Sequence, residues 1–187
     1  MVLDGPGPLV AEEGRSASFD ISRSDGEGLK PRVESIDIEA LCDQVLAEHE
    51  LKAQNAEVRL SKHVTAGTLS ADLGQIHRVL DNLVENAIRH APESSEVQLS
   101  VAQSVGSIEL RVADRGPGVA PDERAKIFEP FVQLEHGQRV AQRSGRGLGL
   151  TFCKVAVEAH GGRIWIEDAQ PGSVFCVSLP QPAGARG

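Results

Sequence analysis

Aromatic residues are scarce in this chain of 187 residues, and tyrosine is missing altogether. Trp165 is the single tryptophan, and five phenylalanines complete the aromatic set. An aromatic platform on which nucleic-acid bases could stack is therefore not expected. The chain also has no block of lysines and arginines, and its formal net charge is -8. This charge argues against nucleic acid as the main ligand, because neutralising phosphates requires a basic face.

Cysteine and long apolar runs are also in short supply. Cys42, Cys153 and Cys176 are widely spaced and odd in number, and no C-x-x-C pair offers a zinc site, so we expect buried, reduced thiols. No apolar run is long enough to cross a bilayer, and the first residues lack the basic and apolar halves of a signal peptide. We expect a soluble, cytoplasmic segment without membrane contact of its own, whose parent protein could still be membrane-anchored.

What the chain does contain is enough apolar sequence for one domain. Hydrophobic residues make up 40% and charged residues 25%, which suits a single globular core. Residues 1–35 are rich in Gly, Ser, Pro and charge and are interpreted as a tail or linker. The ordered domain is expected over residues 36–180, followed by a short tail at 181–187.

Apolar periodicity predicts helices and strands in mixed order. A first helix begins after Ser35 or Asp37, and the strongest helix carries an apolar face formed by Leu73, Ile76, Leu80, Leu83, Val84, Ala87 and Ile88. A further helix follows at 147–160, and strands are predicted at 57–62, 96–103, 107–114, 162–168 and 173–180. Because β-α-β alternation is irregular, we predict an α+β, two-layer sandwich: a mixed sheet with helices packed on one face.

A polar stripe follows the apolar face of the strongest helix. Asn82, Glu85, Asn86 and Arg89 recur at spacings of three and four residues and therefore share one side of that helix. Amide and carboxylate oxygens in this arrangement suit Mg²⁺ and the phosphates that accompany it. The alternative is an ordinary solvated helix face.

The segment "DRGPGV" comes directly after a predicted strand. A carboxylate at the end of a strand, here Asp114, can accept a hydrogen bond from an exocyclic amine. Gly116 and Gly118 let the backbone approach a flat ligand closely. The alternative is an ordinary Asp-Gly turn.

The segment "SGRGLGL" opens a helix with several glycines. Bare backbone N–H groups at a helix N-terminus attract anions, and Arg143 and Arg146 add positive charge. The spacing matches neither a P-loop nor a dinucleotide fingerprint, and a flexible linker remains the alternative. Elsewhere, His49 is interpreted as a surface histidine, and the histidines show no metal-ligand pattern.

In this order the motifs resemble the catalytic ATP-binding domain of bacterial sensor histidine kinases, within the wider family of gyrase, the Hsp90 chaperones and MutL. The resemblance covers about residues 36–180. "DNLVENAIRH" resembles the N box, "DRGPG" the G1 box, "IFEPF" the F box, "GRGLGL" the G2 box and "PGSVF" the last glycine-containing box. The implied fold is the Bergerat type, and the implied cofactors are ATP and Mg²⁺.

The resemblance also implies roles for single residues. Asp114 would read the adenine amine, Asn86 would ligate Mg²⁺, and Phe128 and Phe131 would anchor a lid spanning roughly residues 132–146. Asn82 and Glu85 would belong to the catalytic set with Asn86, with Glu85 as an orienter or base for the attacking histidine. The other implied nucleotide contacts are Arg89, His90, Gly116, Gly118, Arg143, Arg146, Gly147, Leu148, Gly149 and Ser173.

Position 82 favours one branch of this resemblance. In the ATP-hydrolysing relatives the matching residue is a glutamate that activates water, whereas Asn82 cannot take a proton. Phosphoryl transfer depends mainly on positioning and charge stabilisation, so a kinase can dispense with that base. The implied partners are a phosphoacceptor histidine hairpin and a response regulator, and we expect a monomer. The acceptor histidine is not visible here. The alternatives are a serine kinase of the anti-sigma-factor type and a non-catalytic nucleotide-binding module.

Overall fold

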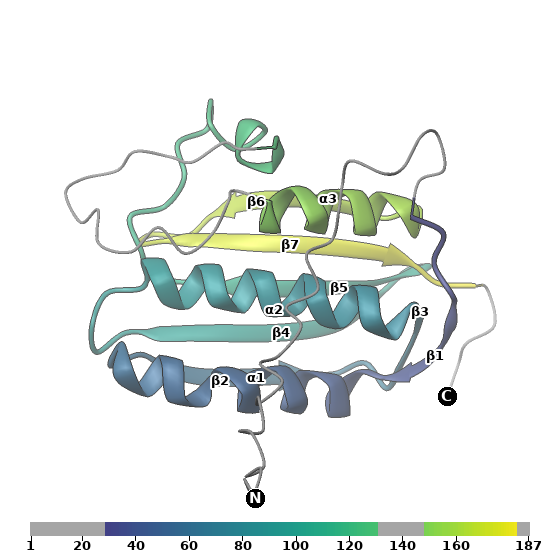
Figure 1. The fold of residues 1–187 in the computed structure, drawn as a ribbon, viewed down its shortest axis with the longest axis horizontal. Helices are drawn as coiled ribbons and strands as arrows, with labels where there is room; N and C mark the ends of the chain where they lie inside the picture. The colour runs from purple at the N-terminus through teal and green to yellow at the C-terminus, as the bar shows by residue number, and fades with distance from the viewer. Residues whose placement is uncertain (1–28, 131–147, 183–187) are drawn as a thin grey trace, which may run out of the picture.

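A mixed sheet of five strands forms one layer of the structure, and three helices cover one of its faces (Figure 1). The computed structural model describes residues 29–130 and 148–182. The strand order is β2-β4-β5-β7-β6. The bounds are Arg59–Val64 for β2, Glu96–Ser104 for β4, Ser107–Ala113 for β5, Arg163–Asp168 for β6 and Ser173–Pro180 for β7. The β2–β4 pair is parallel and the other pairs are antiparallel, which confirms the predicted mixed sheet.

The helical layer consists of α1 (Ile38–Asn55), α2 (Leu73–His90) and α3 (Gly149–Ala159), with α2 between the other two (Figure 1). The side chain of Asp37 accepts a hydrogen bond from the Ala40 N–H and begins α1, so Asp37, not Ser35, is the cap. Asp72 caps α2 in the same way through the Gln75 N–H. In both helices an acceptor satisfies a backbone donor that the first turn leaves unpaired.

The core lies between the two layers and follows the alternation of the strands. Along β5, Ile108, Leu110 and Val112 are buried against the helices, while the intervening residues face the opposite side of the sheet. The predicted apolar face of α2 is buried with one exception. Leu73, the first residue of the helix, has the spacing of that face but remains 43% exposed.

Two short strands were not predicted. β1 (Glu34–Asp37) and β3 (Thr68–Ala71) pair antiparallel in a separate sheet that lies at the N-terminal ends of α1 and α2. Each has four residues, which is too short for alternation to distinguish a strand from a loop. Ahead of β1, the Arg32 N–H donates to the Asp72 carboxylate, so the chain already contacts the domain before residue 36.

The structure corrects the interpretation of His49. Its side chain is buried between α1 and α2, with 7% of the residue exposed, and Nε2 lies 2.9 Å from Oδ1 of Asp81. The expectation of buried free thiols is confirmed for all three cysteines. Among the described helices, none combines the length and hydropathy of a membrane span.

After β5, a short 3-10 helix forms at Lys126–Phe128. The Phe128 ring packs edge-on against Phe175 of β7, with the ring centroids 6.5 Å apart. This contact anchors the segment that follows β5 to the sheet. Phe131 and the predicted lid at 132–146 lie outside the described residues.

Candidate functional site

Asp114 follows β5 and continues its alternation, so its side chain points to the helix-covered face of the sheet. The residue is 5% exposed. Its Oδ1 accepts the Gly116 N–H at 2.7 Å, and its Oδ2 accepts the Ser173 hydroxyl at 2.7 Å. Since each carboxylate oxygen has two acceptor positions, both oxygens can accept one more donor from a ligand.

Three segments converge closely around this carboxylate. A Cβ at Gly116 would lie 2.7 Å from the carbonyl oxygen of His90, the last residue of α2. A Cβ at Gly172, which has a φ of +108°, would lie 1.9 Å from the carbonyl oxygen of Asp114. Gly118 also has a positive φ, and a Cβ there would lie 3.0 Å from the Gly172 carbonyl oxygen. Side chains are therefore excluded where the end of α2, the strand end and the β6–β7 turn meet.

The polar stripe of α2 meets the start of α3. Asn82 donates its amide to the Arg78 carbonyl oxygen at 2.7 Å. A Cβ at Gly149 would lie 2.4 Å from the Asn82 amide oxygen, so a side chain at the start of α3 would have to displace that amide. Leu148 precedes this first residue of the helix. The structure thus places Gly149, at the start of α3, beside Asn82 of α2.

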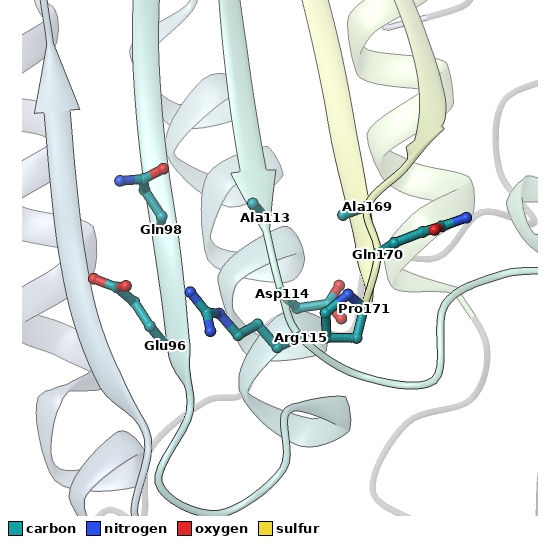
Figure 2. Close-up of a pocket in the computed structure, with 8 residues that line it drawn as sticks. All are labelled: Glu96, Gln98, Ala113, Asp114, Arg115, Ala169, Gln170 and Pro171. Carbon is teal, nitrogen blue, oxygen red and sulfur yellow. The ribbon is translucent and has the colours of Figure 1, made fainter.

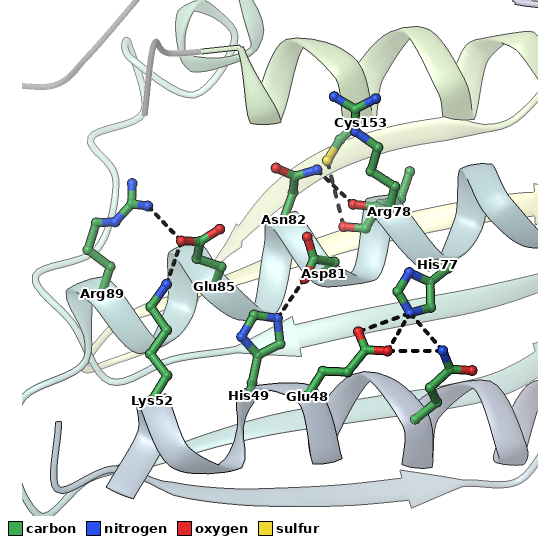
Figure 3. Close-up of polar contacts among 12 residues, drawn as sticks. Glu48, His49, Lys52, His77, Arg78, Asp81, Asn82, Glu85, Arg89 and Cys153 are labelled. Carbon is green, nitrogen blue, oxygen red and sulfur yellow. Dashed lines mark hydrogen bonds and ion pairs between the residues drawn. The ribbon is translucent and has the colours of Figure 1, made fainter. Parts of the chain in front are cut away.

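One turn further along α2, Glu85 forms ion pairs with two cations (Figure 3). Its Oε1 lies 2.5 Å from Lys52 Nζ and 3.3 Å from Arg89 Nη2. Burial raises the pKa of this carboxyl, but the hydrogen bond and charge of Lys52 and the charge of Arg89 outweigh burial and lower it. Glu85 is thus held as a carboxylate between α1 and α2.

His90 is the last residue of α2 and connects the stripe to the Asp114 region. Desolvation and the charge of Arg89 lower the pKa of its imidazole, while the charge of Asp114 acts in the opposite direction. A lowered pKa favours the neutral ring, which can both donate and accept a hydrogen bond.

Not every predicted contact falls within the described residues. Arg143, Arg146 and Gly147 lie outside them. Conversely, Gly172 was assigned to a motif but given no role, and Lys52 was not predicted at all. The Pro-Gly pair before β7 was a signal for a special backbone at Gly172, but nothing in the sequence showed that it packs on Asp114. Lys52 belongs to no motif, and only the packing of α1 on α2 brings it to the stripe.

A pocket of about 310 Å³ also touches Asp114, but it opens on the other face of the sheet (Figure 2). Gln98 and Ala113 are register partners in β4 and β5, and both alternate with core residues, so they point away from the helices. Arg115 and the turn 169–171 complete the lining. None of the α2 stripe residues contributes, so this pocket and the helix-side arrangement are two separate sites.

Comparisons with known proteins agree with this geometry. The profile of the histidine kinase-, DNA gyrase B- and HSP90-like ATPases matches residues 71–183. The chain is 31% identical over 183 residues to the sensor-like histidine kinase SenX3 of Mycolicibacterium smegmatis, covering 92% of this chain and 47% of that protein.

Two solved structures are similar in both fold and sequence. Full-length ShkA in complex with AMPPNP superposes with a TM-score of 0.71 at 32% identity, covering 82% of this chain and 32% of ShkA. The catalytic domain of the histidine kinase ThkA superposes with a TM-score of 0.69 at 27% identity, covering 79% of this chain and 95% of that domain. ThkA has also been solved in complex with the response regulator protein TrrA.

The chain belongs to the histidine kinase-, DNA gyrase B- and HSP90-like ATPase family. Its described elements form the ATP-binding fold of that family, and its relatives are sensor histidine kinases. The chain spans about half the length of SenX3 and a third of ShkA.

Proposed function

We propose that this chain is the catalytic, ATP-binding part of a histidine kinase, which delivers the γ-phosphoryl group of ATP to a histidine on a phosphoacceptor hairpin. The observation that carries the proposal is the buried Asp114 carboxylate. Gly116 and Ser173 donate hydrogen bonds to it, and the backbone of Gly116 also packs against the end of α2, the helix with the amide stripe. Similarity to SenX3 and to nucleotide-bound ShkA supports the same activity.

Asp114 recognises the adenine. Both of its oxygens have an acceptor position left beside their hydrogen bonds to Gly116 and Ser173. The N6 amine of adenine is a donor that fits such an oxygen. Glycine at position 116 lets the backbone that donates to Asp114 lie against the end of α2, because a side chain there would collide with the His90 carbonyl oxygen.

Asn86 ligates Mg²⁺ through its amide oxygen. It lies one turn after Asn82 on the partly exposed side of α2. Mg²⁺ in phosphoryl-transfer sites usually keeps several waters and takes phosphate oxygens as ligands, so one or two protein oxygens are sufficient. When bound, the ion neutralises charge on the β- and γ-phosphates.

The other residues of the stripe position neighbouring groups and stabilise the charge of the phosphates. Asn82 holds the start of α3 beside α2, and Arg89 supplies positive charge for the phosphates. Glu85 is a weak proton acceptor because its pKa is lowered, which favours the orienting role over that of a base. His90, Leu148, Gly149 and, beyond the described residues, Arg143, Arg146 and Gly147 complete the proposed nucleotide contacts.

A transfer experiment tests the proposal. The chain is incubated with γ-labelled ATP and Mg²⁺, with and without a separately purified phosphoacceptor hairpin of a sensor histidine kinase. Acid-labile, alkali-stable label on the hairpin is expected, and Asn86→Ala should abolish it. Acid-stable label on a partner would instead indicate a serine kinase, and nucleotide binding without transfer would indicate a regulatory module.

A response regulator would accept the phosphoryl group downstream. The isolated chain would be a monomer. The ThkA complex with TrrA supports the first of these, because it shows a related kinase together with a response regulator. Sedimentation equilibrium tests the second: a mass near 19.9 kDa is expected across the concentration range.

A further inference from the structure

Lys52 lies in the last turn of α1, outside every motif of the nucleotide site, yet its side chain reaches α2 (Figure 3). Its Nζ donates to Oε1 of Glu85 at 2.5 Å, and the same oxygen accepts from Nη2 of Arg89 at 3.3 Å. One carboxylate oxygen therefore bridges a cation from each helix. All three side chains are partly exposed, with 47% of Lys52, 32% of Glu85 and 47% of Arg89 accessible.

The charges of this cluster determine what Arg89 can offer to a ligand. Lys52, Glu85 and Arg89 together carry one net positive charge. Without Lys52, the Glu85 carboxylate would cancel the charge of Arg89, and the cluster would be neutral. The other carboxylate nearby, Asp81, is paired with His49 at 2.9 Å.

The position of the cluster makes its net charge relevant to the nucleotide. Glu85 directly precedes Asn86, and Arg89 lies one turn later on the same stripe of α2. Without Lys52, the Glu85 carboxylate would lie beside the proposed triphosphate and repel the phosphates. It would also draw Arg89 away from the phosphates. Arginine is the residue best suited to bidentate contact with phosphate, so the loss would be felt in phosphate binding.

We propose that Lys52 is a positioning residue for the nucleotide phosphates: it neutralises Glu85 from α1 and so leaves the charge of Arg89 for the phosphates. This inference rests on the proposed function, because it places the triphosphate beside the α2 stripe. It adds a residue from a helix that carries none of the family motifs. Lys52 acts through Glu85 and Arg89 and does not itself contact the nucleotide.

Calorimetric titration of the whole chain with Mg·AMPPNP and, separately, with adenosine tests the inference. Adenosine reports the Asp114 region alone, since it has no phosphates. The variants are Lys52→Met, Lys52→Arg, and the double variant Lys52→Met with Glu85→Gln. The matched control is Lys62→Met, because Lys62 also pairs with carboxylates of α1, Asp43 at 2.7 Å and Glu39 at 3.1 Å, but near the opposite end of that helix.

Lys52→Met should weaken Mg·AMPPNP binding by about two- to fivefold and leave adenosine binding unchanged. The loss should shrink between about 0.05 M and about 0.5 M salt, because screening weakens exposed charges. Lys52→Arg should bind normally. The double variant should bind Mg·AMPPNP more tightly than Lys52→Met alone, because removing the carboxylate restores one net positive charge. Lys62→Met should match the wild type for both ligands.

Several outcomes would overturn the inference. Unchanged Mg·AMPPNP affinity in Lys52→Met would show that the charge of Lys52 does not reach the phosphates. A double variant no better than Lys52→Met, or an equal loss for adenosine, would make Lys52 a structural residue. A wild-type chain that binds neither ligand would refute the proposed function itself, which is a different result from wild-type binding that Lys52→Met leaves intact.

Discussion

At the scale of single residues, the carboxylate of Asp114 shows how a buried acceptor becomes selective. Burying a charged group is costly unless its oxygens are hydrogen-bonded, and here Gly116 and Ser173 each supply one donor. A ligand that places a further donor at this carboxylate is accepted, whereas one that places a carbonyl there is repelled. Adenine has an amine at the position where guanine has a carbonyl.

We therefore expect ATP to bind at least about tenfold more tightly than GTP, since an unpaired buried polar group costs about 1–3 kcal/mol. Asp114→Asn should weaken ATP binding and narrow the preference, because an amide can turn either a donor or an acceptor to the base. Calorimetric titration of both nucleotides into both proteins measures this. Equal wild-type affinities for ATP and GTP would show that Asp114 is only a turn residue.

Two glycines with positive φ give a second test at this scale. A Cβ at Gly106, φ +71°, meets no atom within 4 Å, whereas a Cβ at Gly172, φ +108°, would lie 1.9 Å from the Asp114 carbonyl oxygen. Gly106→Ala should lower the unfolding free energy by about 1–2 kcal/mol, because alanine is strained in the left-handed conformation. Gly172→Ala should cost that plus overpacking of about 1–3 kcal/mol, and should also weaken ATP binding.

Urea unfolding and ATP titration of the two variants make the comparison. Both variants are Gly→Ala at positive φ, so the difference between them reports the close approach to Asp114 together with the larger φ of Gly172. Equal losses of stability, with ATP affinity intact in Gly172→Ala, would mean that the β6–β7 turn moves without disturbing the carboxylate.

At the scale of elements, the contact between α1 and α2 contains a titratable pair. The hydrogen bond from His49 is the main cause that lowers the pKa of Asp81, against a smaller opposing effect of burial. The folded state therefore binds this proton more weakly than the unfolded chain. The resulting stability is complete above the ordinary pKa near 3.8 and is lost as the pH falls through the lower folded value.

We expect the unfolding free energy of the wild type to fall with pH below about 4, the range in which unfolded aspartates are protonated. Asp81→Asn should flatten part of this slope, because the amide does not titrate, at the expense of some stability at pH 7. Urea midpoints from pH 7 to about pH 3 check this. Asp43→Asn is the control on the exposed side of α1, and an identical slope in wild type and Asp81→Asn would contradict the assignment.

At the scale of the whole molecule, nucleotide and metal should stabilise the domain together. A ligand present at about 100 times its dissociation constant stabilises the folded state by about 2.7 kcal/mol. We expect Mg·AMPPNP to raise the melting temperature more than AMPPNP with a chelator. Asn86→Ala should remove the magnesium-dependent part and keep the remainder.

The control for this measurement is Asn55→Ala, which changes an exposed asparagine at the end of α1. It should respond to magnesium like the wild type. A full magnesium-dependent shift in Asn86→Ala would show that the amide stripe is a solvated helix face and that the ion binds elsewhere.

Much of the architecture could be predicted because it depends on local patterns. Apolar spacing in α2, alternation in β4 and β5 and the apolar run in β7 identify their elements without reference to partners. The motif order predicted the fold class and the family, both of which the structure and the comparisons confirm. The short strands β1 and β3 were not predicted, because four residues carry too little periodicity to identify a strand.

The sequence by itself determined which residues could serve a nucleotide: an amide stripe on one helix, a carboxylate after a strand and glycines at a helix start. These are properties of residue type and spacing, and they do not depend on distant contacts. Only the tertiary structure decided which side chains meet. Burial of α1 against α2 enclosed the histidine expected on the surface, His49, and brought Lys52 to Glu85. The β6–β7 turn reached Asp114 because β5 and β7 are neighbours in the sheet, which no local pattern specifies.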